Sequence, residues 1–86
     1  MIRIWAKLVR DDKIIKDTIY ENPAVFNIDN FYNYITDIAE SLQIATPITL
    51  SKHLNYFMDF NTTTYLPSDF PETIDFDKFV LEQANI

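Results

Sequence analysis

Residues 2–21 constrain the fold more than any other part of this sequence. They form two runs rich in β-branched and aromatic residues, IRIWAKLV and IIKDTIYE, around the polar turn RDDK, and neither run contains proline. Two such runs separated by a short polar turn predict an antiparallel β-hairpin. If Asp11 and Asp12 form a two-residue turn, Arg10 lies opposite Lys13, and this pair sets the register of the two strands.

This register predicts that the hairpin has two different faces. The predicted pairs include Leu8 with Ile15, Ile4 with Ile19, and Trp5 with Thr18. One face then carries Ile2, Ile4, Ala6, Leu8, Ile15 and Ile19. The other carries Arg3, Trp5, Lys7, Val9, Ile14, Lys16 and Tyr20. Because a slip by one residue would turn the apolar set outward, the patterns of both runs favour this register.

The middle of the chain predicts one long and one short helix. Residues 27–43 place apolar side chains at helical spacing without proline or glycine, and Asn27 or Asp29 can act as the N-cap. The apolar stripe of this helix is expected to pack on the apolar face of the hairpin. Pro47 holds the next segment extended, and Ser51 can cap the shorter helix. A short strand is expected at residues 64–66, before a turn between Pro67 and Pro71.

The closing segment TIDFDKFVLEQA, residues 73–84, is compatible with a strand, a helix or an acidic metal-binding loop. A strand is favoured, because a two-stranded hairpin is marginally stable and a third strand would stabilise it. The sequence therefore predicts a single α+β domain over residues 1–86. Its expected architecture is an antiparallel β-hairpin plus a C-terminal strand, packed against one long and one short helix.

Two missing residue types narrow the chemistry of the chain. It contains no cysteine, which excludes disulfides, thiolate zinc sites and cysteine nucleophiles and suits a reducing cytoplasm. It contains no glycine, which excludes the glycine loops that bind phosphates. Turn positions with positive φ must then be occupied by asparagine or aspartate. No apolar run approaches the length that a bilayer requires, so we expect a soluble cytoplasmic protein without membrane contact.

Charge is distributed unevenly along the 86 residues, whose net charge is −6. Residues 1–16 hold five basic and two acidic groups, whereas the other seventy residues hold two basic and eleven acidic groups. A basic amino-terminal element on an acidic body predicts either recognition of a partner or an internal charge match.

The outer face of the hairpin is the predicted partner-binding surface. It interleaves cations with aromatic side chains: Arg3, Trp5, Lys7, Lys16 and Tyr20. Three interpretations remain open, namely a second small core under a loop or helix, an interface with a protein or with a second copy, and single-stranded nucleic-acid binding. Because the acidic body repels phosphates, nucleic acid is disfavoured. We expect a non-catalytic protein-interaction or homodimerising module.

Acidic residues and the one histidine support a weaker alternative, a small metal-dependent hydrolase. It would use Asp75, Asp77 and His53. The group Asp69, Glu72, Asp75 and Asp77 has no specific metal-ligand spacing, and we expect Asp69 and Asp75 to accept local backbone amides while Glu72 and Asp77 are solvated. His53 is expected on the surface, in the first turn of the short helix. No catalytic residue, metal or cofactor is therefore assigned.

Four segments resemble a family of short uncharacterised bacterial proteins: IWAK, KDTIYE, PITL and TYLPSDFPETIDFDKF. The resemblance extends over the whole chain and implies a hairpin, a long helix, a short helix and a final strand entered by IDFD. It implies no activity. Similar proteins carry a tryptophan after the Pro-Ile pair and a basic cluster in and after the short helix, where this chain has Thr49 and NYFMDFNTTT. An anion site built on such a cluster would be missing here.

Overall fold

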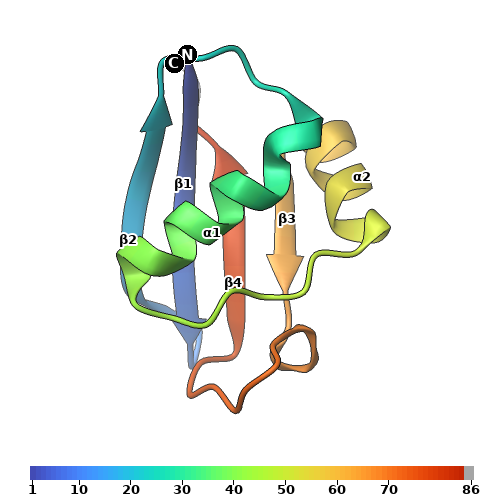
Figure 1. Cartoon of the computed structure of the whole chain (residues 1–86). Coiled ribbons are helices and arrows are strands. Elements are labelled where there is room, and N and C mark those ends of the chain that lie inside the picture. The colour runs from blue at the N-terminus through green and yellow to red at the C-terminus, as the bar shows by residue number, and fades with distance from the viewer. Residues whose placement is uncertain (85–86) are drawn as a thin grey trace.

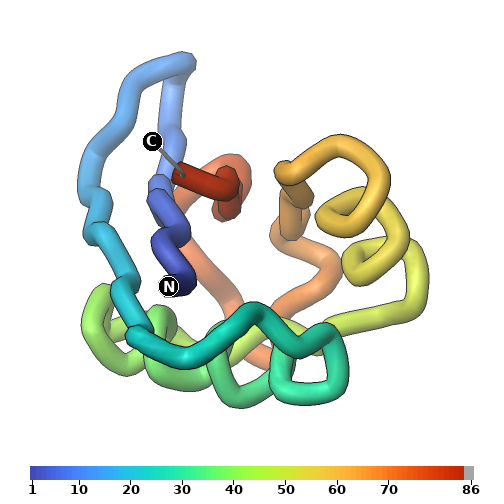
Figure 2. Tube along the Cα trace, turned by 90° about the horizontal axis from the view of Figure 1, so that it is seen from above, coloured from blue at the N-terminus to red at the C-terminus, as the bar shows by residue number. Residues whose placement is uncertain are grey.

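A computed structural model describes residues 1–84 and shows a four-stranded antiparallel sheet with one helix across one face and a second helix beside one edge (Figures 1 and 2). The strand order is β2-β1-β4-β3, with the strands at Ile2–Arg10, Lys13–Asn22, Thr62–Tyr65 and Lys78–Gln83 in chain order. The helices are α1, Phe31–Leu42, and α2, Ser51–Phe60, and single 3-10 turns lie at Ile28–Asn30 and Pro67–Asp69. The predicted α+β fold is confirmed, and the closing segment is a strand.

Strand β1 organises the sheet because it pairs with β2 on one side and with β4 on the other. Its alternate residues Ile2, Ile4, Ala6 and Leu8 are buried, as the apolar alternation of the sequence predicts. Helix α1 crosses this face and buries its own stripe, which consists of Phe31, Tyr34, Ile35, Ile38, Ala39 and Leu42. We call this helix-covered side the inner face of the sheet and the opposite side the outer face.

The observed register of the hairpin differs from the predicted register beyond the first two pairs after the turn. Arg10 does lie opposite Lys13, but a β-bulge between Leu8 and Val9 shifts every later pair by one residue. The observed pairs are Val9 with Ile14, Leu8 with Lys16, Trp5 with Ile19, and Ile4 with Tyr20. Ile15 is the extra residue of the bulge. Ile15 and Ile19, which were expected in the core, are instead exposed to solvent.

Contacts with α1 explain why the shifted register is stable. Lys16 now lies on the inner face, where its Nζ donates to the carbonyl oxygen of Leu42 at 2.8 Å, at the C-terminal end of α1. The partial negative charge of a helix C-terminus favours this ammonium group. Tyr20 also turns inward, and its ring centroid lies 5.9 Å from that of Tyr34. The alternative register would point both side chains away from the helix.

Within residues 1–84, four residues adopt left-handed backbone conformations, and because the chain has no glycine these positions are occupied by other residue types. Asp11 and Asp12 have φ values of 54° and 63° in the hairpin turn, and Asn61 has a φ of 60° between α2 and β3. These three positions confirm the expectation that asparagine and aspartate would occupy turn positions with positive φ. Gln43, at the C-terminal end of α1, has a φ of 58° and is the exception, because a long side chain is disfavoured in this region.

Replacing Gln43 by glycine is therefore expected to stabilise the fold. Gln43→Gly removes the clash of a Cβ atom in the left-handed conformation at the end of α1, and should raise the free energy of unfolding by about 1 kcal/mol. Chemical denaturation of the variant measures this change. Gln43→Ala is the matched control, because it shortens the side chain but keeps the Cβ atom and should bring no gain. A Gln43→Gly protein that is less stable than wild type would contradict this view of the helix end.

Candidate functional site

The five residues of the predicted partner surface do not share one face. Arg3, Trp5 and Lys7 lie on the outer face, as expected. Lys16 and Tyr20 lie on the inner face against α1, so that part of the prediction is wrong. The physical reason is the bulge at Ile15, since one extra residue reverses the facing of every side chain that follows it.

Cations on the outer face are already paired with groups of the same sheet. Arg3 Nη2 lies 2.8 Å from Glu21 Oε2, and Lys7 Nζ lies 3.5 Å from Glu82 Oε2. Lys7 Nζ also lies 4.1 Å from the centroid of the Trp5 ring. A third cation, Lys78, lies on the same face opposite Val9, and the carboxylates of Asp17, Glu21 and Glu82 balance the three positive charges there. These ion pairs fit one of the two explanations for the basic amino-terminal element, which is that its cations match acidic groups of the same molecule.

Trp5 is held in place on the outer face but remains half-buried. Its Nε1 donates to Asp17 Oδ2 at 2.8 Å, and its cross-strand neighbour is Ile19. The helices α1 and α2 do not lie over this side of the sheet, as the view along the strands shows (Figure 2). The ring of Trp5 and the side chain of Ile19 therefore form a small apolar area in a surface of charged pairs.

The free edge of β2 adjoins this area and is the main feature that sequence reasoning missed. Strand β2 is ten residues long and lies at one end of the sheet, and no other strand in the described part of the chain pairs with its outer edge. Three large apolar side chains on this strand are exposed, those of Ile14, Ile15 and Ile19. A long edge strand with exposed apolar side chains is a template for pairing with another strand.

The acidic residues after β3 serve local structure. Asp69 Oδ2 accepts the amide of Leu66 at 2.9 Å, which confirms one expected role. Asp77 was expected in solvent but accepts the amide of Asp11 at 2.9 Å and so ties the hairpin turn to the start of β4. The carboxylate of Asp75 lies 3.7 Å from Arg10 Nη1. Within residues 1–84 no three histidine or acidic groups come together to hold a metal ion.

His53 is buried, which corrects its predicted place on the surface. It lies in the first turn of α2 as expected, but its side chain is only 1% exposed. Its Nδ1 accepts the amide of Leu50 at 2.8 Å and replaces the predicted Ser51 cap. The neutral ring therefore carries its proton on Nε2, 3.3 Å from Asp69 Oδ2. This contact joins α2 to the turn after β3.

The surroundings of His53 fit a structural role. Its ring stacks on that of Tyr65 with centroids 4.2 Å apart, and the hydroxyl of Tyr65 lies 2.9 Å from that of Thr49. Burial raises the pKa of Tyr65 to about 12, so the phenol stays protonated at neutral pH. Asp75 and Asp77 contact the hairpin turn instead of His53, so the three groups of the proposed hydrolase are not brought together.

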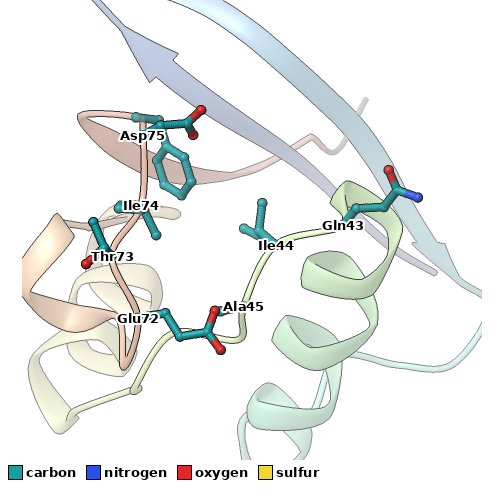
Figure 3. Close-up of a pocket in the computed structure, with 8 residues that line it drawn as sticks. Gln43, Ile44, Ala45, Glu72, Thr73, Ile74 and Asp75 are labelled. Carbon is teal, nitrogen blue, oxygen red and sulfur yellow. The ribbon is translucent and has the colours of Figure 1, made fainter.

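A hollow of about 320 Å³ lies between the segment after α1 and the loop before β4 (Figure 3). Ile44 and Ile74 face one another across it, and the Glu72 carboxylate points toward Ala45 (Figure 3). The remaining lining residues are Gln43, Thr73, Asp75 and Phe76. The lining holds one hydroxyl and two carboxylates but no imidazole, so it lacks a nucleophile with an adjacent histidine base. It is an apolar depression with an acidic rim.

Burial of His53 gives the protein a pH-dependent stability. Desolvation lowers the pKa of His53 below its usual 6.5, and the hydrogen bond that its Nε2 donates to Asp69 offsets this only in part. The unfolded chain therefore takes up this proton first, so the contribution of His53 is complete above pH 6.5 and is lost as the pH falls below it. We expect the free energy of unfolding to drop between pH 7.5 and pH 5.5, by about 1.4 kcal/mol for each pH unit in which only the unfolded state is protonated.

A His53→Gln variant is the control for this pH effect. Glutamine can still accept the Leu50 amide but does not titrate, so the variant should be less stable at neutral pH and should lose less stability over the same interval. Urea denaturation at each pH measures both proteins. Parallel pH profiles for the two proteins would show that His53 does not titrate on unfolding.

Comparisons with known proteins do not place the chain in a family. No protein-family model, curated sequence or solved structure matches it. The resemblance to short bacterial proteins therefore remains a prediction. In residues 1–84, no helix is both long and apolar enough to cross a membrane. The function has to be argued from the surfaces that the fold exposes.

Proposed function

We propose that this protein is a non-catalytic interaction module that forms a homodimer through the free edge of β2 and the adjoining outer face. The observation that carries the proposal is the ten-residue edge strand with its three exposed isoleucines. The unpaired N–H and C=O groups along such an edge bind another strand more readily than any other kind of partner. The lack of cysteine fits a reducing compartment such as the cytoplasm.

The exposed apolar side chains of β2 suit a second copy of the same strand as the partner. In a symmetric dimer the two copies of β2 run antiparallel, so each copy presents Ile14 and Ile19 to the other on the outer face. Apolar and β-branched side chains on neighbouring strands stabilise their pairing. Two sheets joined in this way would form one continuous sheet.

Trp5 extends the proposed interface onto the outer face. It lies beside Ile19, which is 50% exposed, and tryptophan is enriched among the residues that dominate interface energies. Lys16 and Tyr20, which the sequence placed in the partner surface, take no part in this interface through their side chains, because they face α1. The proposal therefore keeps Arg3, Trp5 and Lys7 from the predicted set and adds Ile14 and Ile19.

Single-stranded nucleic-acid binding is not favoured by this arrangement. The outer-face cations Arg3 and Lys7 are already close to carboxylates, and the chain carries a net charge of −6. A phosphate backbone would have to displace these carboxylates while approaching an acidic protein. Tyr20, the second base-stacking ring of that hypothesis, faces α1.

An added charge on the β2 edge should separate the dimer. We expect wild-type protein at tens of micromolar to sediment as a dimer and Ile19→Lys to sediment as a monomer, because a lysine there would be buried without a partner. Val25→Lys is the matched control, since Val25 is an apolar residue outside the sheet that is 84% exposed, and this variant should remain dimeric. Circular dichroism checks that both variants fold. A monomeric wild type, or a dimeric Ile19→Lys protein, would refute the proposed interface.

A further inference from the structure

Helix α2 packs along β3, the last strand of the sheet on its side (Figures 1 and 2). Of its ten residues only His53 and Phe57 are buried, whereas Tyr56, Met58 and Phe60 are exposed. Helix α1, in contrast, buries six side chains. An element held by few buried side chains opens at a lower cost in free energy than the core. Helix α2 is therefore more easily released from the sheet than α1.

His53 joins α2 to the segments on both sides of it in the chain. Its ring stacks on that of Tyr65 at the end of β3, and its Nε2 lies 3.3 Å from Asp69 Oδ2 in the turn after β3. The backbone carbonyl of Asp69 accepts the amide of Ile48 at 2.7 Å, which attaches the segment before α2 to the same turn. At the start of the helix, His53 Nδ1 accepts the Leu50 amide. The neutral ring, with its proton on Nε2, satisfies both of its own hydrogen bonds at once.

A protonated His53 ring cannot keep both of these hydrogen bonds. The imidazolium carries a proton on Nδ1 as well as on Nε2, so Nδ1 would point a donor at the N–H of Leu50, whose nitrogen lies 2.8 Å away. The new charge would also lie in the first turn of α2, where the positive end of the helix dipole disfavours a cation. Protonation therefore breaks the bond that caps the start of α2.

The charged and titratable groups around His53 do not reverse this balance. Asp69 attracts the imidazolium, whereas Lys52 repels it and burial removes its hydration. Burial raises the pKa of Tyr65 to about 12, so this ring stays neutral in acid. Residues 43–50, which precede α2, contain no titratable side chain. The pKa of His53 is accordingly lowered, with burial as the largest cause, so protonation favours states in which the ring reaches solvent.

We propose that protonation of His53 releases α2 from the edge of β3 while the sheet and α1 remain folded. A ten-residue helix is marginally stable in water on its own, so α2 unwinds once it loses the contacts of its first turn. The ring of Tyr65 and the edge of β3 are then exposed. Because an open strand edge can pair with another strand, the protein acquires a second such edge in acid, in addition to that of β2. This opening is local and does not depend on the proposed dimer.

Amide hydrogen exchange, followed by nuclear magnetic resonance on the full chain at pH 7.5 and pH 5.5, tests this release. The protection factor of the Phe57 amide, corrected for the intrinsic pH dependence of exchange, should fall about fivefold to tenfold in acid, because an exposed histidine takes up its proton near pH 6.5. The amides of Ile4 in β1 and Ile38 in α1 should stay at least about tenfold better protected than that of Phe57 at both pH values, because α2 opens without them.

The matched variant is His53→Gln, whose Phe57 protection should be the same at both pH values because glutamine does not titrate. The release should persist in Ile19→Lys, because α2 lies at the other end of the sheet from β2. If His53→Gln does not fold, the wild-type protein decides the question through the ring signal of His53, which is unambiguous because the chain has one histidine.

Four results would overturn the inference. The first is a Phe57 protection that does not change with pH in the wild-type protein, and the second is an equal change in His53→Gln. The third is equal protection of Phe57 and Ile4, which would mean that α2 opens only when the whole chain unfolds. The fourth is a His53 ring signal that titrates at or above pH 6.5 in the folded protein.

Discussion

Burial of alternate side chains of β1 beneath α1 is the constraint on which the rest of the structure depends. Ile2, Ile4, Ala6 and Leu8 face the apolar stripe of the helix, and the backbone of β1 is bonded to a strand on each side. Each large aliphatic side chain in such a position contributes about 1.5–3 kcal/mol. Because α1 covers the inner face and α2 lies beside β3, the outer face and the edge of β2 are left as the surfaces available to partners (Figure 2).

Much of this architecture follows from sequence patterns that are each compatible with only one type of secondary structure. The period of two in β1, the helical spacing before Gln43 and the paired aspartates of the turn each predict what the structure shows. The register of β2 is different, because its sequence is ambiguous: Ile14, Ile15, Ile19 and Tyr20 supply large apolar side chains to either face. The choice is made by tertiary contacts, namely those of Lys16 with Leu42 and of Tyr20 with Tyr34. These contacts have no local signal in the sequence.

The same limit applies to the candidate sites. His53 and Asp69 are sixteen residues apart and meet only because α2 and the turn after β3 pack together, so the sequence alone suggested a surface histidine. The outward facing of Ile19 on the edge strand β2 depends on the bulge, which tertiary contacts select (Figure 1). Composition narrows the chemistry of the molecule, since a chain without cysteine and glycine has no thiolate sites and no glycine loops for phosphates.

The central claim is that one bulge turns Tyr20 inward and Ile19 outward, and cross-strand nuclear Overhauser contacts test it most directly. The account predicts contacts between the backbone protons of Ile4 and Tyr20 and between those of Trp5 and Ile19. Contacts of Ile4 with Ile19 and of Trp5 with Thr18 would instead establish a hairpin without the bulge. That result would return Ile19 to the core and remove its side chain from the proposed dimer interface.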